Sequence, residues 1–127
     1  MKNKVSFDFD LTLSLKSVQK YAKELLDRGV EVWIITSRKD NKSALSETYN
    51  DDLFKVADEV GISRDNIIFT CYKNKSDFLD DSFLWHLDDD VIELSFVKTD
   101  TNVYPVCIYN NQNWREDCEN FFKYEEK

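Results

Sequence analysis

Short apolar runs alternate along the chain with segments whose apolar residues recur every three or four positions. Apolar runs of this length predict strands, and the wider spacing predicts amphipathic helices. The predicted strands cover residues 4–8, 31–36, 66–70, 83–88 and 103–109. The predicted helices cover residues 15–28, 50–60, 76–83 and 91–97, and a last one carries Trp114, Cys118, Phe121 and Phe122. This alternation favours an α/β fold, a three-layer sandwich around a mostly parallel, about five-stranded Rossmann-like sheet.

Length and composition fit one domain over residues 1–127. The chain has 127 residues, 42% of them hydrophobic, which is enough for one core and too few for two ordinary domains. Its net charge of −8 repels free nucleic acid, so stable nucleic-acid binding is not expected. Its three cysteines fit no disulfide, zinc or redox pattern, and no apolar segment reaches the length of a membrane span. We therefore expect a cytoplasmic protein without a membrane partner.

Residues that can hold phosphate or metal follow four of the five predicted strands. In chain order they are Asp8 and Asp10, then Thr36-Ser37-Arg38, then Lys73 and Lys75, and finally Asp88-Asp89-Asp90. In an open parallel sheet the carboxyl ends of the strands meet at one edge, and ligands bind there. The pattern therefore predicts that these side chains share one site.

The chemistry of these residues fits a phosphoryl-transfer site. Two neighbouring carboxylates such as Asp8 and Asp10 repel each other unless a cation or a shared proton intervenes, and Mg²⁺ prefers carboxylate oxygens. The Thr36 hydroxyl and the Lys75 ammonium can hold phosphate oxygens. One aspartate can then attack phosphorus while the other moves the proton.

The four motifs, in this order, resemble those of the haloacid dehalogenase (HAD) superfamily of phosphohydrolases. The first strand leads into Asp8-Phe9-Asp10-Leu11-Thr12, which is similar to the family's DxDxT motif except for leucine where glycine is common. Thr36 matches the Thr or Ser that ends the next strand, and Lys75 matches the lysine ahead of strand four. Asp88-Asp89 matches the acidic pair that ends strand four. The resemblance spans about residues 4–109.

The resemblance implies a phosphomonoester hydrolase that acts through an aspartyl-phosphate. In this reading Asp8 is the nucleophile and Asp10 the general acid and base. Thr36 and Lys75 hold the phosphoryl group, and we prefer Lys75 to Lys73 because it directly precedes the predicted helix at residue 76.

The resemblance also implies Mg²⁺ as the cofactor. Its expected ligands are Asp8, the main-chain carbonyl of Asp10, Asp88 and Asp89. We further expect phosphate or substrate near Thr12, Ser37 and Arg38, with Thr12 also fixing the turn by hydrogen bonding to the main chain. Asp90 is expected to cap the helix that starts at residue 91, since aspartate is a favoured N-cap.

The gaps between the motifs are too short for a cap domain. Only about five residues separate Thr70 from Ser76, whereas a domain needs tens of residues. We therefore expect a capless protein with an open site, accessible to a nucleotide, a nucleic-acid end or another exposed phosphate, or covered by a second copy in a homo-oligomer. Two alternatives stay open: a catalytically silent HAD-like binding protein, and a receiver-type phosphoacceptor domain, although the third strand ends in Thr70 rather than in the aspartate of a receiver.

Overall fold

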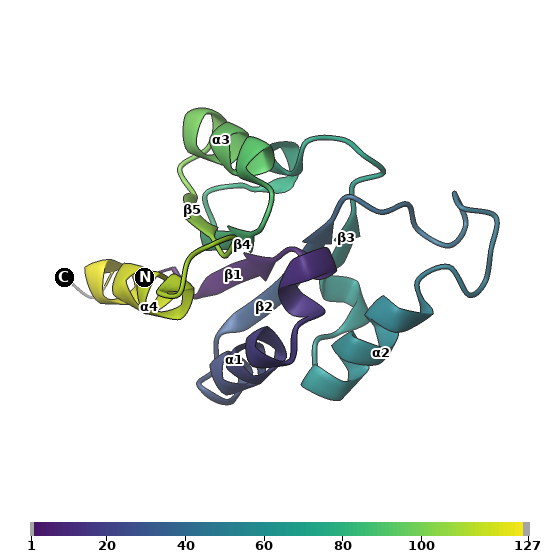
Figure 1. Ribbon diagram of the computed structural model, residues 1–127, viewed down its shortest axis with the longest axis horizontal. Helices are drawn as coiled ribbons and strands as arrows, with labels where there is room; N and C mark the ends of the chain where they lie inside the picture. Colours follow the sequence, from purple (N-terminus) through teal and green to yellow (C-terminus); the bar gives the residue numbers. More distant parts are fainter. Residues whose placement is uncertain (1, 126–127) are drawn as a thin grey trace.

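The computed structural model describes residues 2–125 and has an α/β fold around one five-stranded sheet (Figure 1). The strand order is β3-β2-β1-β4-β5, and every neighbouring pair is parallel. The strands are β1 (Lys4–Phe7), β2 (Glu31–Thr36), β3 (Ile67–Phe69), β4 (Phe83–Asp88) and β5 (Tyr104–Cys107). The predicted fold class and all five predicted strands are confirmed, with ends that differ by at most two residues.

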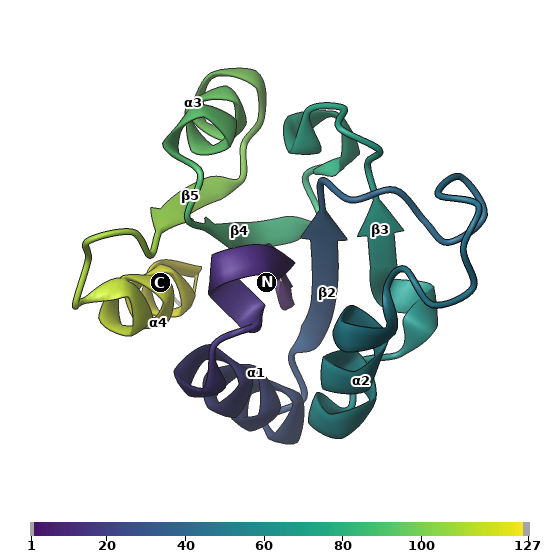
Figure 2. The same cartoon turned by 45° about the vertical axis from the view of Figure 1, so that its right-hand side comes forward.

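Helices cover both faces of the sheet and complete the three layers (Figure 2). The helices are α1 (Lys16–Asp27), α2 (Asp51–Val60), α3 (Val91–Asp100) and α4 (Trp114–Glu125). Helices α1, α2 and α4 lie on one face, and α3 lies on the other together with a short 3₁₀ turn, Lys75–Phe78. Between residues 2 and 125 no helix combines the length and the apolar character needed to cross a membrane.

The predicted helix over residues 76–83 is wrong, because the structure forms only the short turn Lys75–Phe78 there. The chain leaves the helical path where the Asp80 carboxylate accepts a hydrogen bond from the Ser82 N–H at 2.9 Å. Aspartate side chains compete with helical hydrogen bonds in this way and favour turns. The shorter helix leaves Lys75 at the start of a tight turn beside the sheet edge.

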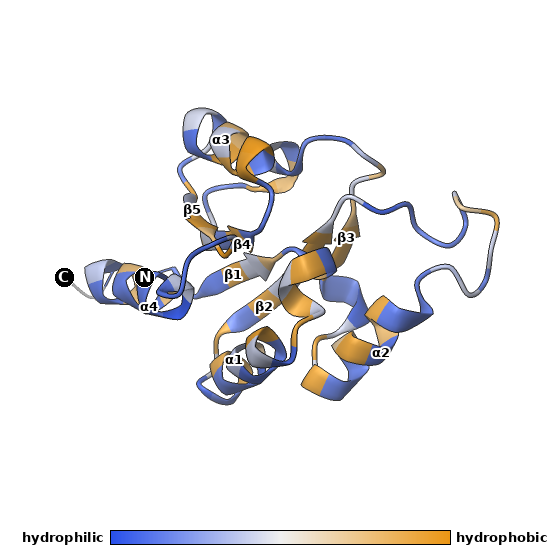
Figure 3. Cartoon of the chain, viewed as in Figure 1, coloured by the Kyte–Doolittle hydropathy of each residue, from blue (hydrophilic) through white to orange (hydrophobic). Residues whose placement is uncertain are grey.

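Apolar side chains fill both spaces between the sheet and its helices. Figure 3 colours the hydrophobic residues of the strands and helices orange along the ribbon. The larger cluster lies under α1, α2 and α4 and centres on Trp85, which is fully buried. The Trp85 ring stacks on Tyr21 with 6.4 Å between the ring centroids, and it meets Phe7 edge-on with 5.3 Å between the centroids. The smaller cluster lies under α3 and contains Ile35, Leu79, Phe83, Val97 and Val103. Both faces of the central strands are therefore buried, as their near-continuous apolar sequences predict.

The chain reverses its direction of travel across the sheet between β1 and β4. From β1 the path through α1 and α2 moves to β2 and β3, whereas from β4 the path through α3 moves the other way to β5. The connections diverge above this strand pair, and ligands in open α/β sheets bind at such a switch point. The Asp8 N–H donates to the Leu87 carbonyl at 2.9 Å, which joins the two strand ends directly.

The residues ahead of α3 and α1 differ in whether they cap the helix that follows. Asp90 caps α3 as predicted, since its carboxylate accepts hydrogen bonds from the Ile92 and Glu93 N–H groups at 2.9 and 3.2 Å. Ser14 does not cap α1, because Leu15 occupies the N-cap position. The Ser14 hydroxyl instead accepts from the Leu11 N–H at 3.0 Å and so stabilises the turn that follows β1.

That turn, Phe9–Leu13, is closed by hydrogen bonds between residues five apart, and its interior is not helical, because Asp10 is extended and Leu11 is left-handed. Leu11 has φ 57° and ψ 15°, a region that glycine enters freely and leucine enters at a cost of about 1–2 kcal/mol. Its side chain is 67% exposed and gains little from packing. Leu11 stands where the resemblance implies a glycine. It therefore adopts a backbone conformation that favours glycine.

Replacing Leu11 with glycine is expected to raise the free energy of unfolding by about 0.5–1 kcal/mol. The relief of left-handed strain exceeds the backbone entropy, about 0.5–1 kcal/mol, that glycine adds to the unfolded chain. Urea denaturation measures the change. As a control, Lys20→Gly on the exposed face of α1 should lower stability by about 1 kcal/mol. A Leu11→Gly protein no more stable than the wild type would contradict the strain at this residue.

Candidate active site at the ends of β1 and β4

Three carboxylates meet where β1 and β4 end. Asp8, Asp88 and Asp89 each contribute one oxygen to a group whose members lie within 4.8 Å of one another. Asp8 and Asp88 are buried, and Asp89 is partly exposed. They border a pocket of about 180 Å³, which is lined by Asp8, Asp10, Leu11, Ser37, Lys75, Asp88, Asp89 and Asp90. The sheet topology thus brings together the acidic residues that the sequence predicted at two separate strand ends.

Lys75 lies between the two buried carboxylates. Its Nζ donates to Asp8 Oδ1 at 2.8 Å and to Asp88 Oδ2 at 2.7 Å, and its side chain is only 2% exposed. The Lys75 main-chain N–H donates to the Glu93 carboxylate on α3 at 3.1 Å, which holds the turn in place. Lys73 is exposed. The lysine that joins the carboxylate cluster is therefore Lys75.

Behind Asp88 lies a buried chain of hydrogen bonds from His86 to Ser6. His86 Nε2 is 2.8 Å from Asp88 Oδ2, and His86 Nδ1 is 2.7 Å from the Ser6 hydroxyl. Burial lowers the pKa of His86 despite the neighbouring carboxylate, so the ring is neutral. A neutral ring that donates from Nε2 and accepts the Ser6 proton at Nδ1 satisfies both bonds. The hydrogen bond of this buried histidine therefore orients an aspartate of the site.

The two buried aspartates have opposite pKa shifts. Burial and the charge of Asp88 raise the pKa of Asp8 to about 9, and the Lys75 ammonium only partly opposes them. Burial also acts to raise the pKa of Asp88, but the His86 hydrogen bond and the Lys75 charge outweigh it and hold that pKa below its usual range. Asp8 and Asp88 therefore share the single ammonium of Lys75. If both were ionised, the group would carry excess negative charge, which a divalent cation would offset.

Arg38 directs the Asp10 carboxylate. Arg38 Nε and Nη2 donate to the two Asp10 oxygens at 3.0 and 2.7 Å, a bidentate geometry. On its other side Arg38 donates to Asp52 at 2.7 and 2.9 Å, and to Asn50 Oδ1 at 3.4 Å. A guanidinium has five N–H donors, so all of them are engaged. The predicted contact of Arg38 with substrate would require one of these bonds to break.

The remaining predicted site residues differ in their access to the pocket. Ser37 lines it. Thr12 is fully buried and donates to Asp8 Oδ2 at 3.3 Å, so its hydroxyl bonds the nucleophile candidate rather than the main chain as predicted. Thr36 is fully buried at the end of β2, and its hydroxyl accepts from the Arg38 N–H at 3.3 Å. Neither threonine is among the residues that line the pocket.

Sequence reasoning missed the residues that support the site from outside it. Asn50 and Asp52 lie at the start of α2 and hold Arg38, while Ser6 and Glu93 reach the site from β1 and α3. Of these, only Ser6 had a readable signal, because residues two apart on a strand face the same way and Ser6 precedes Asp8. The others come from segments that only the fold brings close.

The donor set fits Mg²⁺. Oxygen ligands lie about 2.1 Å from this ion and hence about 3–4 Å from one another. The three carboxylate oxygens already lie within 4.8 Å of one another, so small side-chain movements would bring them into ligand positions. Carboxylates are the protein ligands that this hard cation prefers. Among the described residues Asp8, Asp88 and Asp89 can therefore hold it. The Asp10 carboxylate is bonded to Arg38 and is not part of this group, and the metal role of its main-chain carbonyl stays a prediction.

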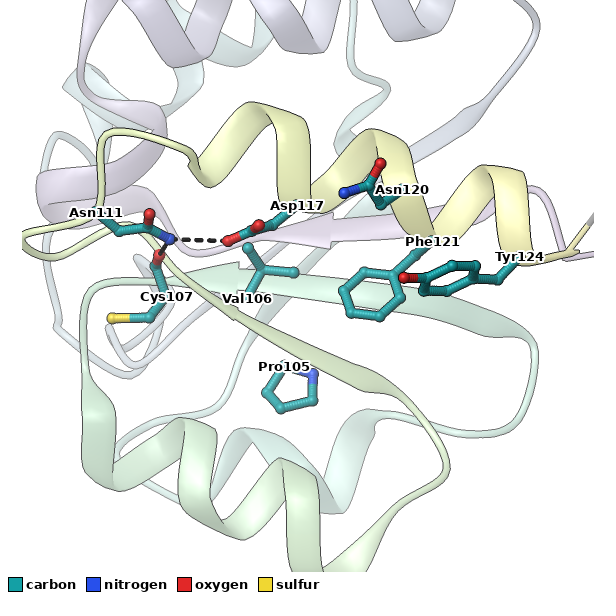
Figure 4. A pocket seen from close by; sticks show the side chains of 8 residues that line it. All are labelled: Pro105, Val106, Cys107, Asn111, Asp117, Asn120, Phe121 and Tyr124. Atoms are coloured by element: carbon teal, nitrogen blue, oxygen red, sulfur yellow. Dashed lines mark hydrogen bonds between the residues drawn. The ribbon is translucent and has the colours of Figure 1, made fainter.

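A second pocket, of about 280 Å³, lies between β5 and α4 (Figure 4). Asn111 borders it and donates through Nδ2 to the Cys107 carbonyl at 2.7 Å and to Asp117 at 3.0 Å. Phe121 and Tyr124 form its apolar end. None of the residues predicted for the site lines this pocket, and its Asn111 and Asp117 side chains already bond each other.

Comparison of the chain with protein-family models, with curated proteins and with solved structures yields no match. The interpretation of the site therefore depends on its own geometry and on the order of its motifs.

Replacing Lys75 with methionine is expected to lower the free energy of unfolding by about 3 kcal/mol or more. The substitution keeps the length of the side chain but leaves two buried carboxylates without their shared cation. Thermal or urea denaturation at neutral pH measures the loss. The matched control Lys73→Met, at an exposed position, should change stability by no more than about 0.5 kcal/mol. Equal effects of the two substitutions would contradict the assignment of Lys75 to the cluster.

Replacing Asp8 with asparagine is expected to stabilise the protein at pH 8 in the presence of EDTA, by about 1–3 kcal/mol. The folded state raises the pKa of Asp8 from 3.8 to about 9, so its contribution to stability is complete below pH 4 and is lost as the pH rises toward 9. Asparagine is neutral throughout, so the difference between the proteins should shrink toward pH 4. Denaturation at several pH values tests this, with Asp27→Asn on the exposed end of α1 as the control. A difference that does not vary with pH would contradict the prediction.

Proposed function

We propose that this protein is a Mg²⁺-dependent phosphomonoester hydrolase of the HAD type, which acts through an aspartyl-phosphate. The observation that carries the proposal is the pairing of Asp8 with Lys75 inside the carboxylate cluster, at the switch point of the sheet. Asp10 follows two residues later at the rim of the same pocket. A nucleophile, a fixed cation and a proton carrier are thus available around one phosphate-sized space.

The first chemical step is displacement at phosphorus by Asp8. A carboxylate oxygen of Asp8 forms the new P–O bond while the bond to the leaving oxygen breaks, and Asp10 gives that oxygen a proton. In the second step water attacks phosphorus, Asp10 takes the proton of the water, and the bond to Asp8 breaks. Inorganic phosphate leaves, and both aspartates return to their starting forms.

The surrounding groups support these steps by position and charge. When bound, Mg²⁺ would supply charge neutralisation for the nucleophile and the phosphoryl oxygens, held by Asp8, Asp88 and Asp89. Lys75 adds a fixed positive charge next to Asp8, and a preorganised charge of this kind is a large source of rate in phosphoryl transfer. The Thr12 hydroxyl and the His86–Asp88 bond hold the two buried carboxylates in place.

Arg38 fixes the direction of the proton carrier. Its two bonds to Asp10 keep that carboxylate at the rim of the pocket, where it is 57% exposed. Asp52 and Asn50 hold the other side of the guanidinium, so α2 is coupled to the position of Asp10.

The strand order weighs against the receiver-type alternative. Receiver domains have the flavodoxin-like order 2-1-3-4-5, whereas this sheet has the order 3-2-1-4-5. The third strand, Ile67–Phe69, is followed by Thr70 rather than by a phosphoacceptor aspartate. The silent binding protein differs from the hydrolase only in turnover, and therefore the decisive test is a kinetic one.

Activity should depend on Mg²⁺ and on the two aspartates of the first motif. Purified protein is expected to release phosphate from an aryl phosphate or a nucleoside monophosphate with Mg²⁺, and to stop when EDTA is added. Asp8→Asn should abolish turnover, and Asp10→Asn should lower kcat by about 10²–10⁴ because it removes general acid–base catalysis. The control Asp27→Asn should keep the wild-type rate.

Metal binding and turnover, measured on the same protein, together separate the hydrolase from the silent alternative. Mg²⁺ should raise the melting temperature of the wild-type protein and have a much smaller effect on Asp8→Asn, since ligand binding to the folded state stabilises it. Stabilisation by Mg²⁺ without turnover of any phosphomonoester would favour the silent binding protein. Turnover that survives Asp8→Asn would exclude Asp8 as the nucleophile.

A further inference from the structure

The carboxylate pocket has room for a phosphoryl group and an ion, but not for the rest of a substrate. Its volume is about 180 Å³, and its lining contains carboxylates, a lysine, a serine and one leucine but no aromatic side chain. The leaving group of a phosphomonoester must therefore extend past the rim. What the protein presents just outside the rim decides which leaving groups it favours.

Tyr72 lies beside this rim on a loop that is bonded to the end of β2. The Tyr72 N–H donates to the Ser37 carbonyl at 2.8 Å, and the Cys71 N–H donates to the Arg38 carbonyl at 3.2 Å. Ser37 itself lines the carboxylate pocket. The two loops leave the carboxyl ends of β2 and β3, at the same edge of the sheet as the carboxylates (Figure 2).

The backbone that carries Tyr72 is strained, yet its ring is left in solvent. Cys71 and Tyr72 have φ 54° and 66°, two consecutive left-handed residues that are not glycine. Such conformations persist only where surrounding bonds impose them, and they concentrate at functional sites. Tyr72 is 68% exposed, so its ring gains little from packing in return.

Tyr49 reaches the same place from the loop before α2. It lines a groove of about 520 Å³ together with Arg38, Thr48, Asp51 and Asp52. Its ring is 42% exposed, and its hydroxyl lies close enough to that of Tyr72 for Tyr72 to raise the pKa of Tyr49. Arg38 joins this groove to the carboxylate pocket, because the same guanidinium binds Asp10 on one side and Asp52 on the other. The two rings therefore stand next to the exit that a leaving group takes.

We propose that Tyr49 and Tyr72, here called the tyrosine rim, select nucleoside phosphates by stacking against the base. This inference depends on the proposed hydrolase function and names its substrate class. An aromatic base fits two exposed rings, since base–aromatic stacking works with every base. Asp51 and Asp52 make the groove acidic, which disfavours a second phosphate there and leaves Asp51 free to accept from a base amino group.

The test compares a nucleoside 5′-monophosphate with ribose 5-phosphate, which is the same phosphoester without the base. The wild-type protein should have a KM about tenfold lower for the nucleotide, with similar kcat. Tyr72→Ala should raise the KM of the nucleotide about tenfold more than that of ribose 5-phosphate, whereas Tyr72→Phe, which keeps the ring, should retain the preference. The control is Tyr109→Ala, because Tyr109 is equally exposed at 69% and lies after β5.

Calorimetric binding of the same two ligands distinguishes the failure of this inference from that of the hydrolase. Hydrolysis of both compounds with equal KM, unchanged by Tyr72→Ala, overturns the tyrosine rim and keeps the hydrolase. Nucleotide binding that weakens about tenfold in Tyr72→Ala, without turnover, keeps the rim and overturns the hydrolase. Absence of both binding and turnover overturns both.

A 5′-phosphorylated oligonucleotide separates the two sources of a base: a KM below that of the mononucleotide supports a strand end, and an equal or higher KM supports a free nucleotide.

Discussion

The site depends on one shared ion pair, in which the Lys75 ammonium bonds Asp8 from β1 and Asp88 from β4. Without this cation the two buried carboxylates would repel each other at the centre of the sheet edge. With it, burial and the charge of Asp88 still raise the pKa of Asp8, so full ionisation of both aspartates requires a further positive charge. The arrangement therefore holds two carboxyl groups in a buried place where a divalent cation would offset their charge.

The rest of the fold holds these charged groups in register. Helix α3 bonds the Lys75 main chain through Glu93, and the His86 ring links Asp88 to Ser6 on the neighbouring strand. A buried charge needs such fixed partners, because a half-satisfied polar network costs more than an apolar core. The polar residues at the strand ends are thus supported from both layers of helices.

The acidic pocket and the exposed tyrosines have complementary positions around Arg38. Its guanidinium bonds Asp10 inside the pocket and Asp52 at the start of α2, where the groove beside Tyr49 begins. The Arg38 guanidinium would then connect the carboxylates that carry out the chemistry with the groove that recognises the rest of the substrate. In the proposed hydrolase, the loops at the strand ends would be the segments that contact a leaving group.

The sequence by itself determined the fold class, the strands, and the order of Asp8, Lys75 and Asp88 along the chain, because hydrophobic periodicity is local and survives in any context. It also predicted the Asp90 cap, which depends on neighbouring backbone alone. Tertiary structure decided the rest: the switch point that joins β1 to β4 and the capture of Arg38 by Asp10 and Asp52. These features arise from contacts between residues far apart in the chain, which no local pattern encodes.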